Sequence, residues 1–165
     1  MIKGLHHNAY RCRDSEETRR FYEGFLGLPL AGTLAIDETK SGRQTSVLHT
    51  FYRLDDGSYL AFFEAPDMPF EWKAQHDFDL HIALEVEPPV LADMLDKGRA
   101  HGVQTRGISD HGFVRSIYFR DPNGYVIELT AKTPEHERMM DPATNNARAN
   151  LDRWQARKAH VRAIR

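Results

Sequence analysis

The sequence predicts an α+β fold built from two consecutive modules of the same order, strand, helix and then three strands. Three observations lead to this prediction. The order of periodic segments is the same in both halves, a His-x-Ala triplet opens each half at His7 and His81, and a glycine turn joins the last two strands of each half at Gly57 and Gly124. Such an internal repeat is a strong organisational signal. We therefore expect one domain over residues 1–132, with modules at 3–65 and 79–132 and a linker at 66–78.

The first module begins with residues 5–12, which alternate well enough to form a strand. A helix is expected from Asp14 to Leu26, because Asp14 can cap it, Glu17 follows three residues later and Gly27 can end it. Phe21, Phe25 and Thr18 are its expected buried side chains. Three strands should follow, at 28–36, 45–54 and 59–64, with the last two joined by the hairpin turn Asp55-Asp56-Gly57.

The linker breaks this pattern with two prolines and several aromatic residues that could pack or cover a pocket. The second module then repeats the order of the first. A strand is expected at 80–86, a helix at 88–101 that ends before Gly102, and a strand at 103–108. The last two strands, 113–120 and 125–130, form a hairpin around the turn Asp121-Pro-Asn-Gly124.

Strand alternation places two histidines and a glutamate on one face. The apolar residues around His81 alternate with it and should meet the helices, which sends His81 to the opposite face. Glu128 alternates with Ile127 and Leu129 in the same way, and His7 follows by pseudo-symmetry. Ala61 occupies the position in the first module that matches Glu128.

A carboxylate within an apolar strand is costly unless it is solvated, paired or bound to a metal. Two imidazoles and one carboxylate with open positions are typical of non-haem Fe(II) sites, although Mn(II), Zn(II) or Ni(II) could take the same ligands. The alternative is an exposed strand glutamate with two structural or surface histidines.

Composition limits the other possibilities. A net charge of -2 gives no reason to expect nucleic acid as a partner. The sequence has no apolar run near the roughly 20 residues that a membrane span needs, and no signal-peptide core. The single cysteine, Cys12, cannot form an internal disulfide. A cytoplasmic location without membrane association is therefore expected.

The repeated order, the segment from His7 to Asp14, the His81-Ile-Ala triplet and the segment from Asp121 to Leu129 together resemble the vicinal oxygen chelate superfamily. This superfamily includes glyoxalase I, fosfomycin- and bleomycin-resistance proteins and extradiol dioxygenases. The resemblance covers residues 3 to about 132. It implies a cup-shaped, incompletely closed mixed β-barrel with helices outside. It also implies one metal ion on His7, His81 and Glu128, and a small-molecule substrate that chelates the metal through two adjacent oxygens.

Residues 109–129 are further similar to the extradiol dioxygenase signature, which implies Fe(II), a catechol-like substrate and O2. The similarity rests on His111, Tyr118, the turn at Asp121 and Glu128, whereas Ser109 departs from the pattern. It implies catalytic roles for His111 and Tyr118, and leaves open that His111 caps a turn while Tyr118 packs. The acid-base histidine of such enzymes has no counterpart near Glu64, so His49 or His76 would replace it. We expect His49 and Phe63 to contact substrate.

Other members of the superfamily supply alternatives to ring cleavage. Arg11 resembles the residue that binds an anionic glutathione carboxylate in glyoxalase I, but Ala61 replaces the fourth ligand of that enzyme. A glyoxalase-type lyase or isomerase and a fosfomycin-resistance-type thiol transferase therefore remain open. A non-catalytic bleomycin-resistance-type binding protein would have no reason to keep three ligands.

Residues 133–165 form an expected C-terminal helical extension. A helix should start near Asp141 and run to Ala163, with Ala147, Leu151, Trp154 and Val161 along one side. This apolar side suggests docking on the same domain or on a second subunit. Members of the superfamily often pair their halves between chains, which implies a homodimer.

Overall fold

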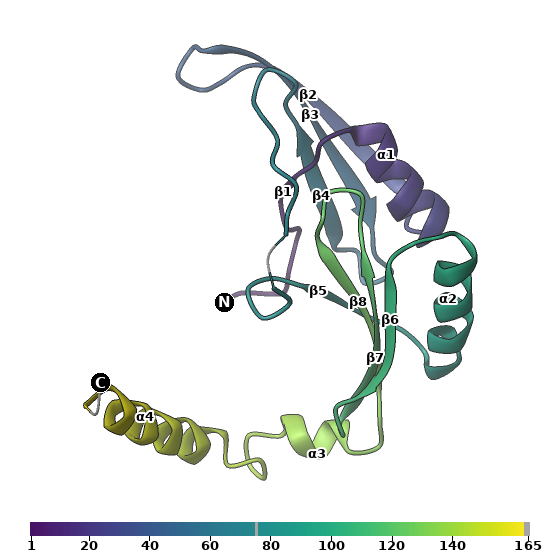
Figure 1. Cartoon of the computed structure of the whole chain (residues 1–165). Coiled ribbons are helices and arrows are strands. Elements are labelled where there is room, and N and C mark those ends of the chain that lie inside the picture. The colour runs from purple at the N-terminus through teal and green to yellow at the C-terminus, as the bar shows by residue number, and fades with distance from the viewer. Residues whose placement is uncertain (75, 164–165) are drawn as a thin grey trace. The chain divides into compact units, whose positions relative to one another are not determined.

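The computed structural model describes residues 1–74 and 76–163 of the chain. Two four-stranded sheets form its framework, with strand orders β1-β4-β3-β2 and β5-β8-β7-β6 (Figure 1). Each sheet contains the strands of one expected module, so the α+β class and the paired modules are confirmed. The two sheets are hydrogen-bonded separately and do not close into one barrel.

The first sheet contains β1 (Tyr10–Arg11), β2 (Leu30–Glu38), β3 (Gln44–Arg53) and β4 (Tyr59–Glu64). β1 runs parallel to β4, whereas β2, β3 and β4 form antiparallel pairs. The register of β3 and β4 places His49 opposite Phe63 and Phe51 opposite Ala61.

The first strand is shorter than the sequence predicts. Only Tyr10 and Arg11 pair regularly, and His7 forms an isolated bridge with Tyr59. Between them the side chain of Asn8 interrupts the backbone pairing, because its Oδ1 accepts the Ala61 N–H at 2.9 Å. The chain therefore follows β4 from His7 onward without forming a continuous strand.

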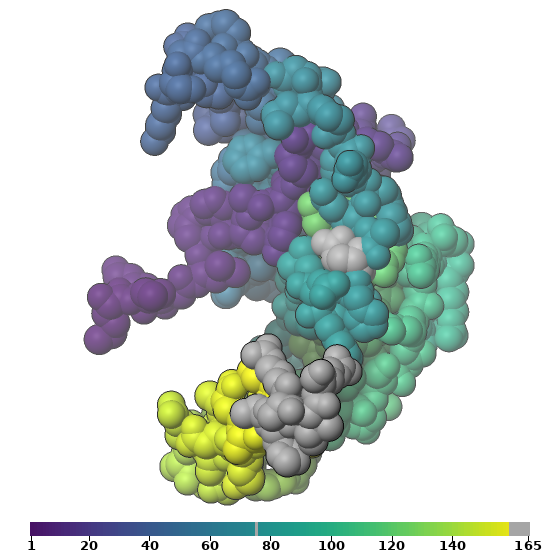
Figure 2. All heavy atoms as spheres, turned by 60° about the vertical axis from the view of Figure 1, so that its left-hand side comes forward, coloured from purple at the N-terminus to yellow at the C-terminus, as the bar shows by residue number. Residues whose placement is uncertain are grey.

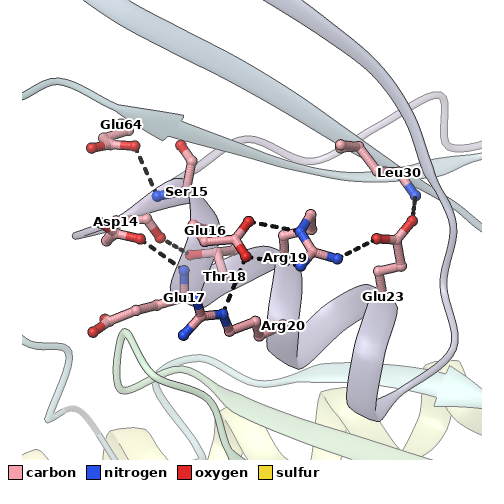
Figure 3. A network of polar contacts seen from close by, with 10 residues as sticks. All are labelled: Asp14, Ser15, Glu16, Glu17, Thr18, Arg19, Arg20, Glu23, Leu30 and Glu64. Carbon is pink, nitrogen blue, oxygen red and sulfur yellow. Dashed lines mark hydrogen bonds and ion pairs between the residues drawn. The ribbon is translucent and has the colours of Figure 1, made fainter.

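The predicted first helix divides into an α-helix and a π-helix, α1 (Ser15–Arg19) and η1 (Arg20–Phe25). Its start was predicted correctly, since Asp14 Oδ1 accepts the Glu17 N–H at 2.7 Å (Figure 3). Near its end the Leu26 N–H donates to the Phe21 carbonyl at 2.9 Å, which is a π-type bond that the apolar spacing does not distinguish from an α-type bond. Gly27 then adopts φ 83°, as expected for a glycine that ends a helix.

The polar surface of this helix is held by charged pairs. Arg19 pairs with Glu16 at 2.7 Å and with Glu23 at 2.6 Å (Figure 3). At the other end, the Ser15 N–H donates to the carboxylate of Glu64 at 2.8 Å, which attaches the helix start to β4.

The apolar side of the helix packs on the first sheet through aromatic rings. The Tyr22 ring is fully buried, with its centroid 4.6 Å from that of Phe62 and 5.4 Å from that of Tyr52. The expected buried residues Thr18, Phe21 and Phe25 are 0%, 7% and 6% exposed. Because side chains alternate along a strand, the neighbours of Phe62 and Tyr52 project from the opposite face of the sheet.

The second sheet contains β5 (Ile82–Glu85), β6 (Thr105–Asp110), β7 (Val114–Arg120) and β8 (Val126–Lys132). Helix α2 (Pro88–Ala100) precedes β6, and its start at two prolines was expected. In β8 every residue from Val126 to Leu129 is buried, so both faces of this strand are covered.

The C-terminal extension contains a short helix, α3 (His136–Met140), and a longer one, α4 (Ala147–Ala163). The second starts later than predicted, because Asp141 Oδ1 accepts the Ala143 N–H at 2.9 Å and so caps a turn between the helices. Leu151 and Trp154 are 49% and 52% exposed, whereas the side chain of Val161 lies outside the described residues. In the part of the chain that the structure describes, no helix is long and apolar enough to cross a membrane.

The chain divides into two compact units. Unit 1 contains residues 1–82 and 119–127, and unit 2 contains residues 83–118 and 128–165. Unit 1 begins with an N-terminal segment, purple in Figure 2, in which Met1 and Ile2 are almost fully exposed.

Candidate functional site

Three of the predicted site residues form one hydrogen-bonded chain in unit 2. His111 Nε2 lies 2.9 Å from the Tyr118 hydroxyl, which in turn lies 3.3 Å from Glu128 Oε1. A carboxylate can only accept, so the phenol donates to Glu128 and accepts from the imidazole N–H. The structure therefore brings the two predicted catalytic residues and one predicted metal ligand into direct contact. We call this set the His111–Tyr118–Glu128 chain.

The Glu128 side chain is buried. It is only 7% exposed, between apolar neighbours on β8, which rules out the alternative of an exposed strand glutamate. A carboxylate in such surroundings needs hydrogen bonds, a counter-charge or a metal ion to offset its lost hydration. The hydrogen bond from Tyr118 supplies part of this.

The Tyr118 phenol keeps its proton at neutral pH. Burial raises its pKa above the ordinary value, and the negative charge of Glu128 raises it further. A protonated phenol next to a carboxylate can donate a hydrogen bond, and it can deliver a proton to a nearby oxygen.

The sequence prediction missed Arg106. Its guanidinium lies over the Tyr118 ring, 4.4 Å from the centroid, and its charge opposes the rise in the Tyr118 pKa. The pairing of β6 with β7 brings the two residues together, and the alternation of the segment from Thr105 to Asp110 was the available signal.

The predicted ligand His81 is exposed and immediately precedes β5. Its Nδ1 lies 2.7 Å from the Asp77 carbonyl oxygen, which can only accept, so Nδ1 carries a proton and donates it. In the neutral ring the lone pair then lies on Nε2. Metal-binding histidines are commonly oriented by this kind of hydrogen bond.

The predicted ligand His7 lies at the edge of the first sheet in a group of three imidazoles. Its Nδ1 is 2.8 Å from Nδ1 of His6, a neighbour that sequence reasoning did not single out. Its ring lies 6.0 Å from that of His49 and 5.7 Å from that of Phe51.

The three predicted ligands supply the donor types that a divalent transition metal prefers, two imidazoles and a carboxylate. Among the described residues, however, no three His, Cys, Asp or Glu side chains are grouped closely enough to hold an ion. The ligand set of His7, His81 and Glu128 accordingly stays a prediction.

The three predicted substrate-binding residues, Arg11, His49 and Phe63, share one face of the first sheet. His49 and Phe63 are cross-strand partners, and Arg11 pairs with Phe63 on its other side. The Arg11 guanidinium lies 3.4 Å from both the Ala65 and the Met68 carbonyl oxygens. These contacts use part of its hydrogen-bonding capacity, and its role in binding an anion stays a prediction. His76, the other candidate acid-base residue, is exposed and accepts the Phe78 N–H at 3.1 Å.

The architecture defines a class of protein, in which two modules of the same βαβββ order each contribute one four-stranded sheet. The chain matches the model of the Glyoxalase/Bleomycin resistance protein/Dioxygenase superfamily over residues 4–129. It belongs to this superfamily.

The chain is similar in sequence to a metallothiol transferase and in fold to a fosfomycin-resistance protein. The chain is 28% identical to the metallothiol transferase FosB of Shouchella clausii over 145 residues, which are 81% of this chain and 83% of that protein. The fold is similar to that of FosX from Listeria monocytogenes, solved with Mn(II) and sulfate, with a TM-score of 0.61 and 21% identity over 83% of this chain and 98% of that one.

A second solved structure is a glyoxylase/bleomycin resistance protein/dioxygenase domain from Frankia sp. EAN1pec. It has a TM-score of 0.64 and 17% identity, covering 81% of this chain and all of that one. At these identities the two solved structures show the fold alone.

Proposed function

We propose that the chain is a metal-dependent transferase of the fosfomycin-resistance type, which adds a thiol to a small oxygen-rich electrophile. The observation that carries this proposal is the His111–Tyr118–Glu128 chain, in which a phenol with a raised pKa connects a buried carboxylate to an imidazole. The identity with a metallothiol transferase over most of both chains supports the thiol as the second substrate.

We propose His7, His81 and Glu128 as the residues that hold the metal. His81 immediately precedes β5, which neighbours the β8 strand of Glu128 in the second sheet, whereas His7 lies beside the first sheet. We propose that two subunits pair so that His7 comes from one chain and the other two ligands from its partner. A divalent ion held there would bind two adjacent substrate oxygens and draw electron density from them.

The residues of this chain would then act on the leaving oxygen. A sulfur–carbon bond forms while a carbon–oxygen bond of the electrophile breaks, and the oxygen keeps the electron pair of that bond. Tyr118 donates its proton to this oxygen and regains one from His111. The thiol loses its proton to solvent, and His111 takes one back from solvent, so that the proton count closes. Glu128 accepts the Tyr118 hydrogen bond in the resting state and so holds the phenol in place.

The test is product formation by the Mn(II)-loaded protein with fosfomycin and either cysteine or glutathione, followed by mass spectrometry. We expect a product with the summed mass of the two substrates, and a rate in Tyr118→Phe that is lower by about 100-fold or more, as for loss of a general acid. Tyr10→Phe is the control, because Tyr10 belongs to β1 of the first sheet and its hydroxyl takes no part in the His111–Tyr118–Glu128 chain. Absence of any adduct from metal-loaded protein would contradict the proposal.

A specific observation favours a second candidate, extradiol ring cleavage. The 2.9 Å contact between His111 and Tyr118 joins the two residues that the dioxygenase signature pairs. In this reaction both atoms of O2 enter the substrate and a ring carbon–carbon bond breaks. Oxygen uptake by Fe(II)-loaded protein with a panel of catechols, and its loss in His111→Ala, would favour this candidate over thiol transfer.

A further inference from the structure

The first sheet carries a continuous set of aromatic rings on the face opposite α1 and η1. His49 and Phe51 project from β3, and Tyr59 and Phe63 from β4. The register sets His49 against Phe63 and Phe51 against Ala61, so a small side chain lies between the larger rings. We call His49, Phe51, Tyr59 and Phe63 the ring wall.

The rings of this wall are in contact with one another. The His49 ring stacks on Phe63, with centroids 3.7 Å apart and planes inclined by 22°. It also lies 4.2 Å from the Phe51 ring, which meets Tyr59 edge-on at 6.1 Å. Phe51, Tyr59 and Phe63 are only half-buried, so part of this apolar surface is open.

One polar atom in the wall is unsatisfied. His49 is 6% exposed, and its Nε2 is buried without a hydrogen-bond partner among the described residues. Buried polar atoms in native proteins almost always have a partner, and an exception calls for an explanation such as a missing ligand. The two phenylalanine rings next to the imidazole, Phe51 and Phe63, belong to half-buried residues, so a ligand that displaces one of these rings could reach the nitrogen.

The wall adjoins the proposed metal ligand His7. The His7 ring is exposed and meets Phe51 edge-on at 5.7 Å. A molecule whose oxygens bind beside His7 would therefore place its organic part against Phe51 and His49. Aromatic surfaces favour planar rings through offset stacking and edge contacts.

We propose that the ring wall binds a planar aromatic ring of the substrate, and that His49 Nε2 hydrogen-bonds an oxygen attached to that ring. The inference rests on the proposed function, because it assumes a substrate held near His7. It adds that an electrophile bearing an aryl ring is bound more tightly than an aliphatic one such as fosfomycin. It also assigns the buried nitrogen of His49 a role in recognition.

The test compares the binding of phenylphosphonate and propylphosphonate to Mn(II)-loaded protein by calorimetry. The two probes share the oxygens that can bind a metal and differ in the ring. We expect phenylphosphonate to bind about tenfold more tightly. Phe51→Leu and Phe63→Leu should each reduce this preference to about threefold or less, whereas Phe113→Leu, a half-buried phenylalanine of unit 2, should leave it unchanged.

A second comparison tests the nitrogen. Among 2-, 3- and 4-hydroxyphenylphosphonate, at least one isomer should bind about fivefold more tightly than phenylphosphonate, as expected for one additional hydrogen bond. This gain should vanish in His49→Phe, which keeps a ring and removes the nitrogen, while the preference for phenyl over propyl remains.

Equal affinity for the two first probes, or no measurable binding of phenylphosphonate, would overturn the ring wall as a binding surface. If a hydroxyphenylphosphonate still binds more tightly than phenylphosphonate to His49→Phe, the proposed hydrogen bond from His49 Nε2 would be overturned. The metal content of the same samples is measured separately, and its absence would count against the proposed function instead.

Discussion

Tyr22 and Asp121 form a buried hydrogen bond on which the stability of unit 1 depends. The Tyr22 hydroxyl donates to Asp121 Oδ2 at 2.9 Å, and both residues are almost fully buried. Burial raises the pKa of Asp121, while hydrogen bonds from Asn123 and Tyr22 act in the opposite direction. The pKa of Asp121 is therefore higher in the folded protein than in the unfolded chain. As the pH rises through this pKa, the buried carboxyl group becomes charged and the folded protein loses stability.

Tyr22→Phe should therefore destabilise the protein more at pH 7 than at pH 4. The variant loses a donor to the carboxylate, so the pKa of Asp121 rises further and its charged form becomes more costly. We expect a loss of about 1–3 kcal/mol at pH 7 in urea unfolding, and a smaller loss at pH 4. Tyr52→Phe is the matched control, because the buried Tyr52 hydroxyl has no hydrogen-bond partner among the described residues. An equal deficit of Tyr22→Phe at both pH values would refute this account.

For single residues, the sequence predicted the members of the candidate site better than it predicted their contacts and burial. Alternation was enough to separate Glu128 from Ile127 and Leu129, but all three proved to be buried, because β8 is covered on both faces. The contact between His111 and Tyr118 depends on how the loop before β7 folds back onto that strand. The order of residues in the sequence does not specify this. Arg106 was missed because its partner lies on another strand.

The turn after β7 and the linker contact each other through Gly124. This glycine has φ 95°, and a Cβ at this position would collide with the backbone of Lys73. The Lys73 N–H also donates to the Asn123 carbonyl at 2.8 Å. Within unit 1 the linker is thus attached directly to the turn.

Gly124→Ala should destabilise the protein more than Gly57→Ala does. Both glycines have a positive φ, which costs a non-glycine residue about 1–2 kcal/mol. Only Gly124 also has backbone atoms in the way, since nothing lies within 4 Å of a Cβ at Gly57. We expect about 1–3 kcal/mol of additional loss in urea unfolding, together with faster proteolysis of the linker. Equal losses in the two variants would show that the collision is relieved without cost.

Elements with strong local signals were predicted closely, and the others were not. The capping residue Asp14, the hairpin turns and the proline start of α2 were all read from local chemistry. The π-helical half of the first helix and the short β1 depend on tertiary contacts, namely the packing of Tyr22 and the side chain of Asn8. At Asp141 the side chain caps a turn, and the helix therefore begins further along the chain than the composition of this segment predicts.

For the whole molecule, the repeat was the most informative feature of the sequence. It predicted two modules of the same strand and helix order and identified His7, His81 and Glu128 as a set, although no single one of them is distinctive. The repeat does not determine which sheets pair to complete a site, because pairing within one chain and pairing between two chains use the same strands and the same residues. This is why the ligand set remains a prediction that metal binding must test.

Mn(II) binding to single variants and to mixed dimers tests the central claim most directly. The wild-type protein should bind about one ion per subunit, and His7→Ala or Glu128→Ala should each lower the affinity by about 100-fold or more. Dimers that combine one His7→Ala subunit with one Glu128→Ala subunit, isolated by two different tags, should recover about half of the wild-type sites. Recovery is expected because one of their two sites then draws all three ligands from unaltered positions. Full occupancy in either single variant would contradict the proposed ligands, and mixed dimers that bind no better than their parents would contradict a site shared between subunits.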